Sequence, residues 1–217
     1  MKYITITIND RRIRVPEGEN LLWAALDNGF YIPNLCALRD NKKPLTSCRL
    51  CFVKIKGHDE PSLACNETVV DSMIVDTQHP EALDLSRTAF ELLMASNIVD
   101  CGSCVANRKC ELQTIARHLH TKLKSKDYRK LLRELPIDNS NPVFYYDPNK
   151  CVLCGRCVWV CRERCGIGII GFAHRGFKRR ITTFADQPLG ESECQNCGDC
   201  VEVCPTGALG FKEQLVK

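Results

Sequence analysis

Two stretches near the C-terminus carry cysteines at the same spacing. They are Cys151-x2-Cys154-x2-Cys157-x3-Cys161 and Cys194-x2-Cys197-x2-Cys200-x3-Cys204, the second followed directly by proline. Runs of four thiols at this spacing are typical of paired 4Fe-4S sites. Zinc is the alternative, but zinc sites usually combine two separated doublets rather than two complete runs of four. The spacing therefore favours iron–sulfur chemistry.

The repeat also predicts which thiols act together. Three closely spaced thiolates can bind three irons of one cube, and the next turn of helix carries the fourth toward the neighbouring cube. We expect one cluster on Cys151, Cys154, Cys157 and Cys204, and the other on Cys161, Cys194, Cys197 and Cys200. Arg162 stands where proline follows Cys161 in the usual pattern. Cys165 is left over, and we expect a buried, inert thiol there.

The first third of the chain holds a looser set, Cys36-x11-Cys48-x2-Cys51-x13-Cys65. One doublet flanked by two distant thiols suits zinc or a 2Fe-2S cluster, and spacing alone leaves these two open. A third group, Cys101-x2-Cys104-x5-Cys110, has only three thiols. A tetrahedral or cubane site needs a fourth donor, which this motif does not contain.

Short elements must position the first set. Residues 2–8 alternate like a strand, Asn9-Asp10 forms a turn pair, and residues 11–15 read as a second strand of a hairpin. A helix should follow from Leu21 and stop at Asn28-Gly29. A hairpin, a helix and a cysteine loop resemble the start of a β-grasp domain. Plant-type ferredoxins share that architecture, with different cysteine spacing, and this favours 2Fe-2S for the first set.

The middle of the chain reads as helical. Residues 80–96 and 112–123 have helical apolar spacing and bracket the three-cysteine group, and the basic run 121–133 reads as a solvated helical face. The sequence predicts an α+β protein in three parts: a β-grasp 2Fe-2S domain at 1–78, a helical three-cysteine domain at 79–140, and a 2×4Fe-4S ferredoxin domain at 141–217. A β insertion is expected at 166–184.

Composition narrows the class of protein. The chain has 217 residues, 16 cysteines and a formal net charge of +4. No signal peptide and no apolar run of about 18 residues is evident, which predicts a cytoplasmic protein without direct membrane insertion. In a reducing compartment, thiols at two-residue spacing are far more often metal ligands than disulfides. No dinucleotide fingerprint, P-loop or nucleic-acid module is present, so no flavin or nucleotide is expected on this chain.

The order of these motifs resembles a known family. A four-cysteine β-grasp domain, then Asp100-Cys101 and Cys110-Glu111-Leu112-Gln113, then a ferredoxin repeat is similar to the iron–sulfur subunit of complex I. The layout is equally similar to the N-terminal region of FeFe hydrogenases and to the small diaphorase subunit of NAD-linked NiFe hydrogenases. The chain ends soon after Cys204, and this brevity favours the diaphorase subunit.

The resemblance also exposes a departure. In that family a histidine four residues before the first cysteine completes the three-cysteine site, and this sequence has Asn97 there. Asparagine is a poor iron ligand, and His118 and His120 are remote substitutes. We expect a third 4Fe-4S cluster on Cys101, Cys104 and Cys110 with an unusual fourth ligand or an open iron.

Resemblance to this family implies an electron-transfer subunit of a soluble oxidoreductase complex. Its partners would be an FMN- and NAD(P)-binding flavoprotein and a catalytic subunit of the hydrogenase or formate dehydrogenase type, with flavin-based bifurcation as one mode. Two alternatives to this function are a complex I-type fragment linked to quinone reduction and a redox-inert zinc-binding interaction scaffold.

Overall fold

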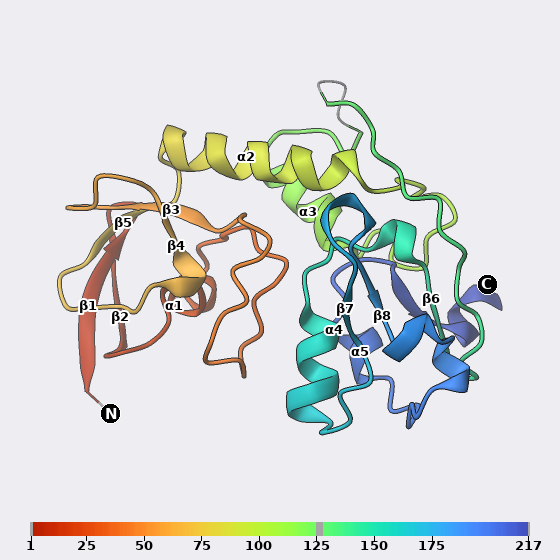
Figure 1. Ribbon diagram of the computed structural model, residues 1–217. Helices are drawn as coiled ribbons and strands as arrows, with labels where there is room; N and C mark the ends of the chain where they lie inside the picture. Colours follow the sequence, from red (N-terminus) through yellow and green to blue (C-terminus); the bar gives the residue numbers. More distant parts are fainter. Residues whose placement is uncertain (1, 125–127, 217) are drawn as a thin grey trace. The chain divides into compact units, whose positions relative to one another are not determined.

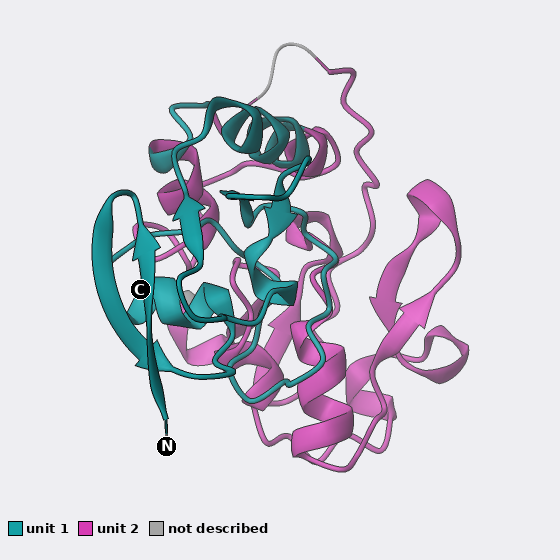
Figure 2. Cartoon of the chain, turned by 90° about the vertical axis from the view of Figure 1, so that its left-hand side faces the viewer, with its two compact units in different colours: residues 1–91, 118–121 teal, residues 92–117, 122–217 magenta. Residues whose placement is uncertain are grey.

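The computed structural model describes residues 2–124 and 128–216. The chain forms two compact units, which Figure 2 draws in different colours. Unit 1 comprises residues 1–91 and 118–121, and unit 2 comprises residues 92–117 and 122–217. Each unit contains its own cysteines and its own hydrophobic core. The three-part division expected from the sequence stays a prediction.

Unit 1 is built on a five-stranded sheet with the strand order β2-β1-β5-β3-β4. The first strand pairs antiparallel with the second and parallel with the fifth, as expected of a β-grasp arrangement. The third strand then pairs antiparallel with both the fifth and the fourth (Figure 1). The strands are β1 (Tyr3–Ile8), β2 (Arg11–Pro16), β3 (Phe52–Ile55), β4 (Ser62–Leu63) and β5 (Ile74–Asp76).

The hairpin predicted at the N-terminus is confirmed. Ile4, Ile6 and Ile8 of β1 are buried, and the residues between them point away from the core, as a period of two requires. Asn9 and Asp10 have φ values of 47° and 65°. A two-residue turn with positive φ at both positions matches the twist of the strands that it joins.

Helix α1 (Leu21–Asp27) begins where the sequence predicts, because Asn20 caps it. The Asn20 side chain accepts a hydrogen bond from the N–H of Leu22 at 3.1 Å, which satisfies one free donor of the first turn. The chain leaves the helix through Gly29 with φ 82°, a conformation that glycine adopts without steric cost. The helix packs on the core of the sheet through Leu21, Leu22, Ala24 and Ala25.

Helix α2 (Pro80–Ala95) confirms the helix predicted for residues 80–96, and it runs from unit 1 into unit 2. Helix α3 (Glu111–His118) is shorter than its apolar spacing predicted. The extension to residue 123 is wrong, because the chain turns at His120, whose φ is 52°.

The basic run 121–133 was expected to be a solvated helix, and this is wrong for its described part. Residues 121–124 and 128–133 contain no helix, and 125–127 lie outside the described residues. The end of the run is instead anchored by hydrogen bonds within unit 2. Arg133 donates to the carbonyl of Cys151 at 2.7 Å and to that of Arg179 at 3.2 Å, while the N–H of Leu131 donates to Ala95.

Unit 2 places the two cysteine runs between a pair of strands. Strand β6 (Phe144–Tyr146) precedes the first run and pairs antiparallel with β9 (Leu209–Phe211), which follows the second. Each run contains one short helix, α4 (Arg156–Trp159) or α5 (Asp199–Glu202). Between the runs, β7 (Gly171–Ala173) and β8 (Arg180–Thr182) form an antiparallel pair within residues 166–184.

Short single turns complete the described chain. They are η1 (Ala64–Asn66), η2 (Pro148–Lys150), η3 (Val160–Arg164), η4 (Gly176–Lys178), η5 (Phe184–Asp186), η6 (Leu189–Glu191) and η7 (Lys212–Val216). Of these, η3 is a π-helical turn that continues α4 and carries Cys161. A π turn inside a helix shifts the direction of the side chains that follow it.

Candidate metal centres

The structure brings Cys204 to the first cysteine run. Cys151, Cys154, Cys157 and Cys204 line one small cavity in unit 2. Burial, followed by the charge on Cys204, raises the pKa of Cys154 to about 12. Burial and then the thiolates of Cys154, Cys151 and Cys204 raise the pKa of Cys157. This is the grouping that crossed ligation requires.

The complementary grouping forms around the second run. Burial, followed by the charges on Cys194, Cys197 and Cys161, raises the pKa of Cys200 to about 12. Cys161 and Cys200 are buried, Cys194 is half-buried and Cys197 is exposed. The thiol set thus has one corner at the surface of the unit.

Both runs use the same backbone geometry to wrap their sulfurs. Leu153 and Asn196 have φ values of 54° and 58°, and each is followed two residues later by a glycine with φ near 80°. Those glycines, Gly155 and Gly198, are the N-caps of α4 and α5. A leucine at positive φ is rare and costs about 1–2 kcal/mol. The N–H of Leu153 points back to the Cys151 sulfur at 3.4 Å, a backbone contact typical of a wrapped anionic sulfur.

The three-cysteine group lines a cavity of its own, also in unit 2. Cys101, Cys104 and Cys110 share this cavity with Asn97. Asn97 is 5% exposed, and its Nδ2 is buried without a hydrogen-bond partner. An unpaired buried amide N–H costs about 1–3 kcal/mol and calls for a hydrogen-bond acceptor, such as a sulfide of a cluster bound in the cavity. Among the described residues, the cavity lining contains no histidine.

The two remote histidines lie elsewhere. His118 and His120 belong to unit 1, whereas the three cysteines belong to unit 2. The His118 ring packs edge-on against Tyr31 with ring centroids 4.8 Å apart. Burial, followed by the charge of His120, lowers the pKa of His118. Within unit 2, Asn97 is one of several polar side chains that line the cavity with the three thiols, together with Asp100, Asn107, Gln113, Lys150 and Thr206.

The three-cysteine cavity adjoins the loop that carries Cys204. A Cβ placed on Gly207 would overlap the sulfur of Cys104, so only glycine leaves room for this thiol. The Cys110 sulfur lies 3.9 Å from the carbonyl of Pro205, which also accepts the N–H of Glu111 at 3.2 Å. The three-cysteine set and the set that contains Cys204 are thus separated in unit 2 by the short backbone segment that follows Cys204.

In unit 1, Cys36, Cys48, Cys51 and Cys65 are all buried. They act in two hydrogen-bonded pairs. The bond between Cys36 and Cys48 lowers the pKa of Cys36 to about 5 and raises that of Cys48. The bond between Cys51 and Cys65 likewise raises the pKa of Cys51 and lowers that of Cys65. In each pair the hydrogen bond favours the thiolate form of one sulfur, and the thiolate is the form that binds metal.

Asn20 holds this set in place from the end of helix α1. Its Nδ2 donates to the carbonyl of Cys65 at 2.7 Å and to that of Glu67 at 3.3 Å, while its Oδ1 caps the helix. The N–H of Ala64 donates to the carbonyl of Cys51 at 2.9 Å. One side chain therefore couples the helix to the cysteine loop.

These thiol sets suit sulfur-bound iron or zinc. Burial and mutual repulsion work against several thiolates in one cavity, and a bound cation removes that penalty by deprotonating the thiols outright. Hard cations such as Mg²⁺ prefer oxygen ligands, which the four-cysteine sets do not offer. The donor sets therefore fit the iron–sulfur centres expected from the sequence.

Sequence reasoning missed two features of these sites. Cys165 is half-buried rather than buried, and it contacts Cys197 instead of packing in the core. Its position directly after η3 could not reveal that contact, because Cys197 lies on a different loop. The close approach of Gly207 to Cys104 was also missed, although a glycine soon after Cys204-Pro205 was a possible signal of it. Among the described residues, no helix is long and apolar enough to cross a membrane.

Three family models match successive parts of the chain. Residues 1–80 match a 2Fe-2S iron-sulfur cluster binding domain, and residues 87–122 match the NADH-ubiquinone oxidoreductase-G iron-sulfur binding region. Residues 141–210 match the ferredoxin-like domain of NADH-quinone oxidoreductase subunit 3. Together with the thiol sets, these matches define an iron–sulfur protein of mixed α and β content with 2Fe-2S and 4Fe-4S domains.

Individual relatives extend this result. The NADP-reducing hydrogenase subunit HndD of Solidesulfovibrio fructosivorans is 34% identical over 99% of this chain, which spans 37% of that protein. Subunit gamma of the NAD-reducing hydrogenase HoxS of Cupriavidus necator is 30% identical, with 95% of this chain and 86% of the relative covered. The chain belongs to the family of iron–sulfur subunits that joins the G-type subunits of NADH-quinone oxidoreductase with this gamma subunit.

A solved structure agrees with that assignment. A chain in the crystal structure of NAD+-reducing NiFe hydrogenase in the H2-reduced state aligns with a TM-score of 0.84 at 29% identity. The alignment covers 96% of this chain and 87% of the other. The similarity thus extends over both compact units.

Proposed function

We propose that this protein is an electron-transfer subunit that relays electrons between a flavoprotein and a catalytic subunit of an oxidoreductase complex. When bound, iron–sulfur clusters take up and release one electron at a time, while the protein sets their potential and position. The buried thiol sets described above are the groups that would hold them. No site for a substrate, flavin or nucleotide is proposed on this chain.

One observation carries the proposal: the Cys204 loop lies directly against the three-cysteine cavity. The Cys104 sulfur occupies the space that a side chain at Gly207 would fill. The Cys110 sulfur lies 3.9 Å from the carbonyl oxygen of Pro205. Tyr145 is influenced by a thiol of each set. Burial and then the charges of Cys104, Asp147 and Cys204 raise its pKa to about 12. Adjacent redox sites separated by a short stretch of protein favour a relay over independent structural metals.

We propose four clusters on three domains with the boundaries expected from the sequence. A 2Fe-2S cluster would sit in unit 1 on the four cysteines from Cys36 to Cys65. A 4Fe-4S cluster would sit in the three-cysteine cavity beside Asn97. Two further 4Fe-4S clusters would have the crossed ligand sets, Cys151, Cys154, Cys157 with Cys204 and Cys161, Cys194, Cys197 with Cys200.

For partners we propose an FMN- and NAD(P)-binding flavoprotein and a catalytic subunit of the hydrogenase or formate dehydrogenase type. The names of two relatives, an NADP-reducing and an NAD-reducing hydrogenase, support this choice. A second candidate is a complex I-type role linked to quinone. It is favoured by the two matches to NADH-quinone and NADH-ubiquinone oxidoreductase regions.

The test is an anaerobic reduction experiment on the purified chain, followed by the visible absorbance of iron-bound thiolates. Dithionite should bleach the chain, and NADH or NADPH alone should not, because the proposal assigns no flavin to it. Addition of the flavoprotein that co-purifies with the tagged chain should make NADH or NADPH an effective reductant. Bleaching of the flavin-free chain by a nicotinamide nucleotide alone would contradict the proposal.

A further inference from the structure

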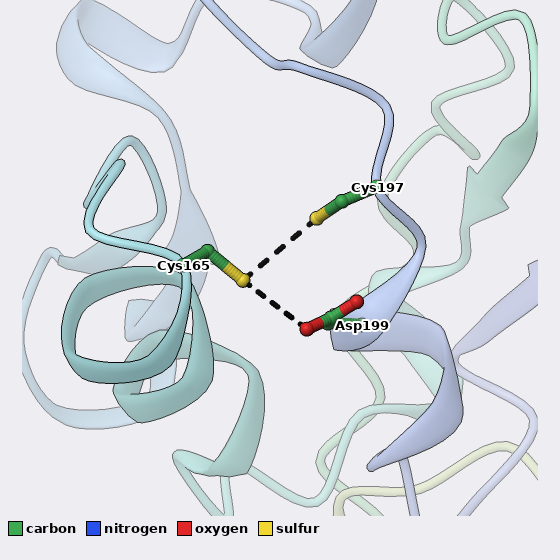
Figure 3. A group of neighbouring side chains, drawn as sticks. All are labelled: Cys165, Cys197 and Asp199. Atoms are coloured by element: carbon green, nitrogen blue, oxygen red, sulfur yellow. Dashed lines mark hydrogen bonds between the residues drawn. The ribbon is translucent and has the colours of Figure 1, made fainter.

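Cys165 is a thiol that the proposed clusters do not use, yet it lies at one of their sites. It follows η3, and its sulfur is 3.8 Å from the sulfur of Cys197 and 3.4 Å from a carboxylate oxygen of Asp199 (Figure 3). The ligand atoms of all three side chains lie within 4.8 Å of one another. Figure 3 shows the Cys165 side chain pointing at the other two across the gap between the two cysteine runs.

The distance between the two sulfurs is informative. A thiolate–metal bond is about 2.3 Å long, so two sulfurs bound to one tetrahedral ion lie about 3.8 Å apart. The Cys165 and Cys197 sulfurs are separated by 3.8 Å. Both thiols can thus reach a common ion without a large movement of either backbone segment.

Cys197 holds the most accessible position in its ligand set. Cys197 is the exposed member of its set, whereas Cys161 and Cys200 are buried and Cys194 is half-buried. An iron bound to the exposed Cys197 would be the one most open to ligand exchange. Cys165, itself half-buried, stands beside Cys197.

We propose that Cys165 is an alternative ligand for the iron that Cys197 holds, so that five thiols serve the four ligand positions of this cluster. The proposal rests on the cluster proposed above for Cys161, Cys194, Cys197 and Cys200. In the exchange, the iron–sulfur bond to Cys197 breaks and one to Cys165 forms. The thiol proton of Cys165 passes to the departing sulfur of Cys197. No electron is transferred, and the iron content stays constant.

The experiment compares iron content and low-temperature EPR of five anaerobically prepared full-length variants: Cys197→Ala, Cys165→Ala, the Cys165→Ala/Cys197→Ala double variant, Cys194→Ala and Cys165→Ala/Cys194→Ala. Cys197→Ala should keep its iron and this cluster's EPR signal, with altered g values because the ligand has changed. Cys165→Ala should resemble the natural protein. The Cys165→Ala/Cys197→Ala variant should lose up to about four irons.

Cys194 supplies the matched control, because it belongs to the same proposed ligand set but not to the group that Cys165 forms with Cys197 and Asp199. Cys194→Ala should lose the cluster whether or not Cys165 is present. A thiol-specific alkylating reagent gives a second readout: it should modify Cys165 in the natural holoprotein and spare it in Cys197→Ala. Cys197→Ser is prepared in parallel to keep the side-chain size.

The outcomes separate the two proposals. The role of Cys165 is overturned if Cys197→Ala or Cys197→Ser loses as much iron as the Cys165→Ala/Cys197→Ala variant. This holds whether the iron is lost from this cluster alone or from both ferredoxin clusters. Loss of the cluster in Cys165→Ala alone also overturns it, because Cys165 would then be the resident ligand. Natural iron content in both Cys194→Ala and the Cys165→Ala/Cys197→Ala variant would instead mean that no cluster occupies this site, which contradicts the proposed function.

Discussion

Gly207 lies so close to Cys104 that any side chain at this glycine would occupy the space of the Cys104 sulfur. The contact joins the three-cysteine cavity to the loop after Cys204, within unit 2. A change in the loop after Cys204 is therefore expected to reach the three-cysteine cavity.

We predict that Gly207→Ala damages the three-cysteine site. The added methyl group must displace the Cys104 sulfur, at a cost of about 1–3 kcal/mol in unfolding free energy for overpacking. Up to about four irons per chain should be lost. Gly171→Ala in β7 is the control, because a Cβ there meets nothing within 4 Å. Full iron content and an unchanged EPR spectrum in Gly207→Ala would show that the loop yields without disturbing the site.

Crossed ligation leads to a prediction about pairs of variants. Cys157→Ser and Cys204→Ser should abolish the same low-temperature EPR signal, although the two residues lie in different runs, because both line one cavity. Cys161→Ser and Cys200→Ser should together affect the other signal, since the charge of Cys161 acts on Cys200. If each variant removes the signal shared by its own run instead, the ligands are not crossed.

Asn20 allows helix capping to be separated from support of the cysteine loop. Asn20→Ala should lose both roles and destabilise unit 1 by about 1–2 kcal/mol through the cap alone. Asn20→Asp keeps an oxygen that accepts the Leu22 N–H, but it cannot donate to the carbonyl of Cys65. We expect Asn20→Asp to retain helix α1 by circular dichroism and to lose 2Fe-2S absorbance faster in air. Equal lability of Asn20→Asp and the natural protein would remove Asn20 from the support of this site.

The three-cysteine site should respond to a better ligand at position 97. Asn97 is buried beside the thiols, but an amide is a weak iron ligand compared with imidazole. Asn97→His should slow the oxidative loss of iron from this site without raising the total iron content. Asn97→Leu, whose side chain is similar in volume to histidine, should not slow that loss. A rise from about 10 to about 14 irons per chain in Asn97→His would mean that the natural site is empty.

Local signals explain how much could be predicted. The hairpin over residues 2–15 and helix α1 follow from alternation, a turn pair and an N-cap, all of which act within a few residues. Helix α3 shows the limit of such signals. Its apolar spacing continues through Leu119, yet the helix ends at His118. Leu119 is buried without being helical, and its carbonyl accepts a hydrogen bond from Arg87 at 3.1 Å. Apolar spacing records burial, which a turn can satisfy as well as a helix.

The candidate sites divide in the same way. The two four-cysteine runs carry their chemistry in their spacing, because three ligands of each proposed cluster come from one loop. The contacts of Cys165 with Cys197 and of Gly207 with Cys104 join residues from different loops, and no periodicity encodes them. The basic run before residue 133 was misread for a related reason. Arg133 binds backbone carbonyls of distant segments, and the sequence gives no sign of these partners.

The proposed electron relay is tested most directly by the metal content of the anaerobically purified chain, measured together with acid-labile sulfide and EPR-monitored redox titration. We predict about 14 irons and a similar amount of labile sulfide per chain, with one-electron signals from one 2Fe-2S and three 4Fe-4S centres. A colourless protein that contains zinc, no labile sulfide and no reducible EPR signal would contradict the central claim that this chain is an electron relay.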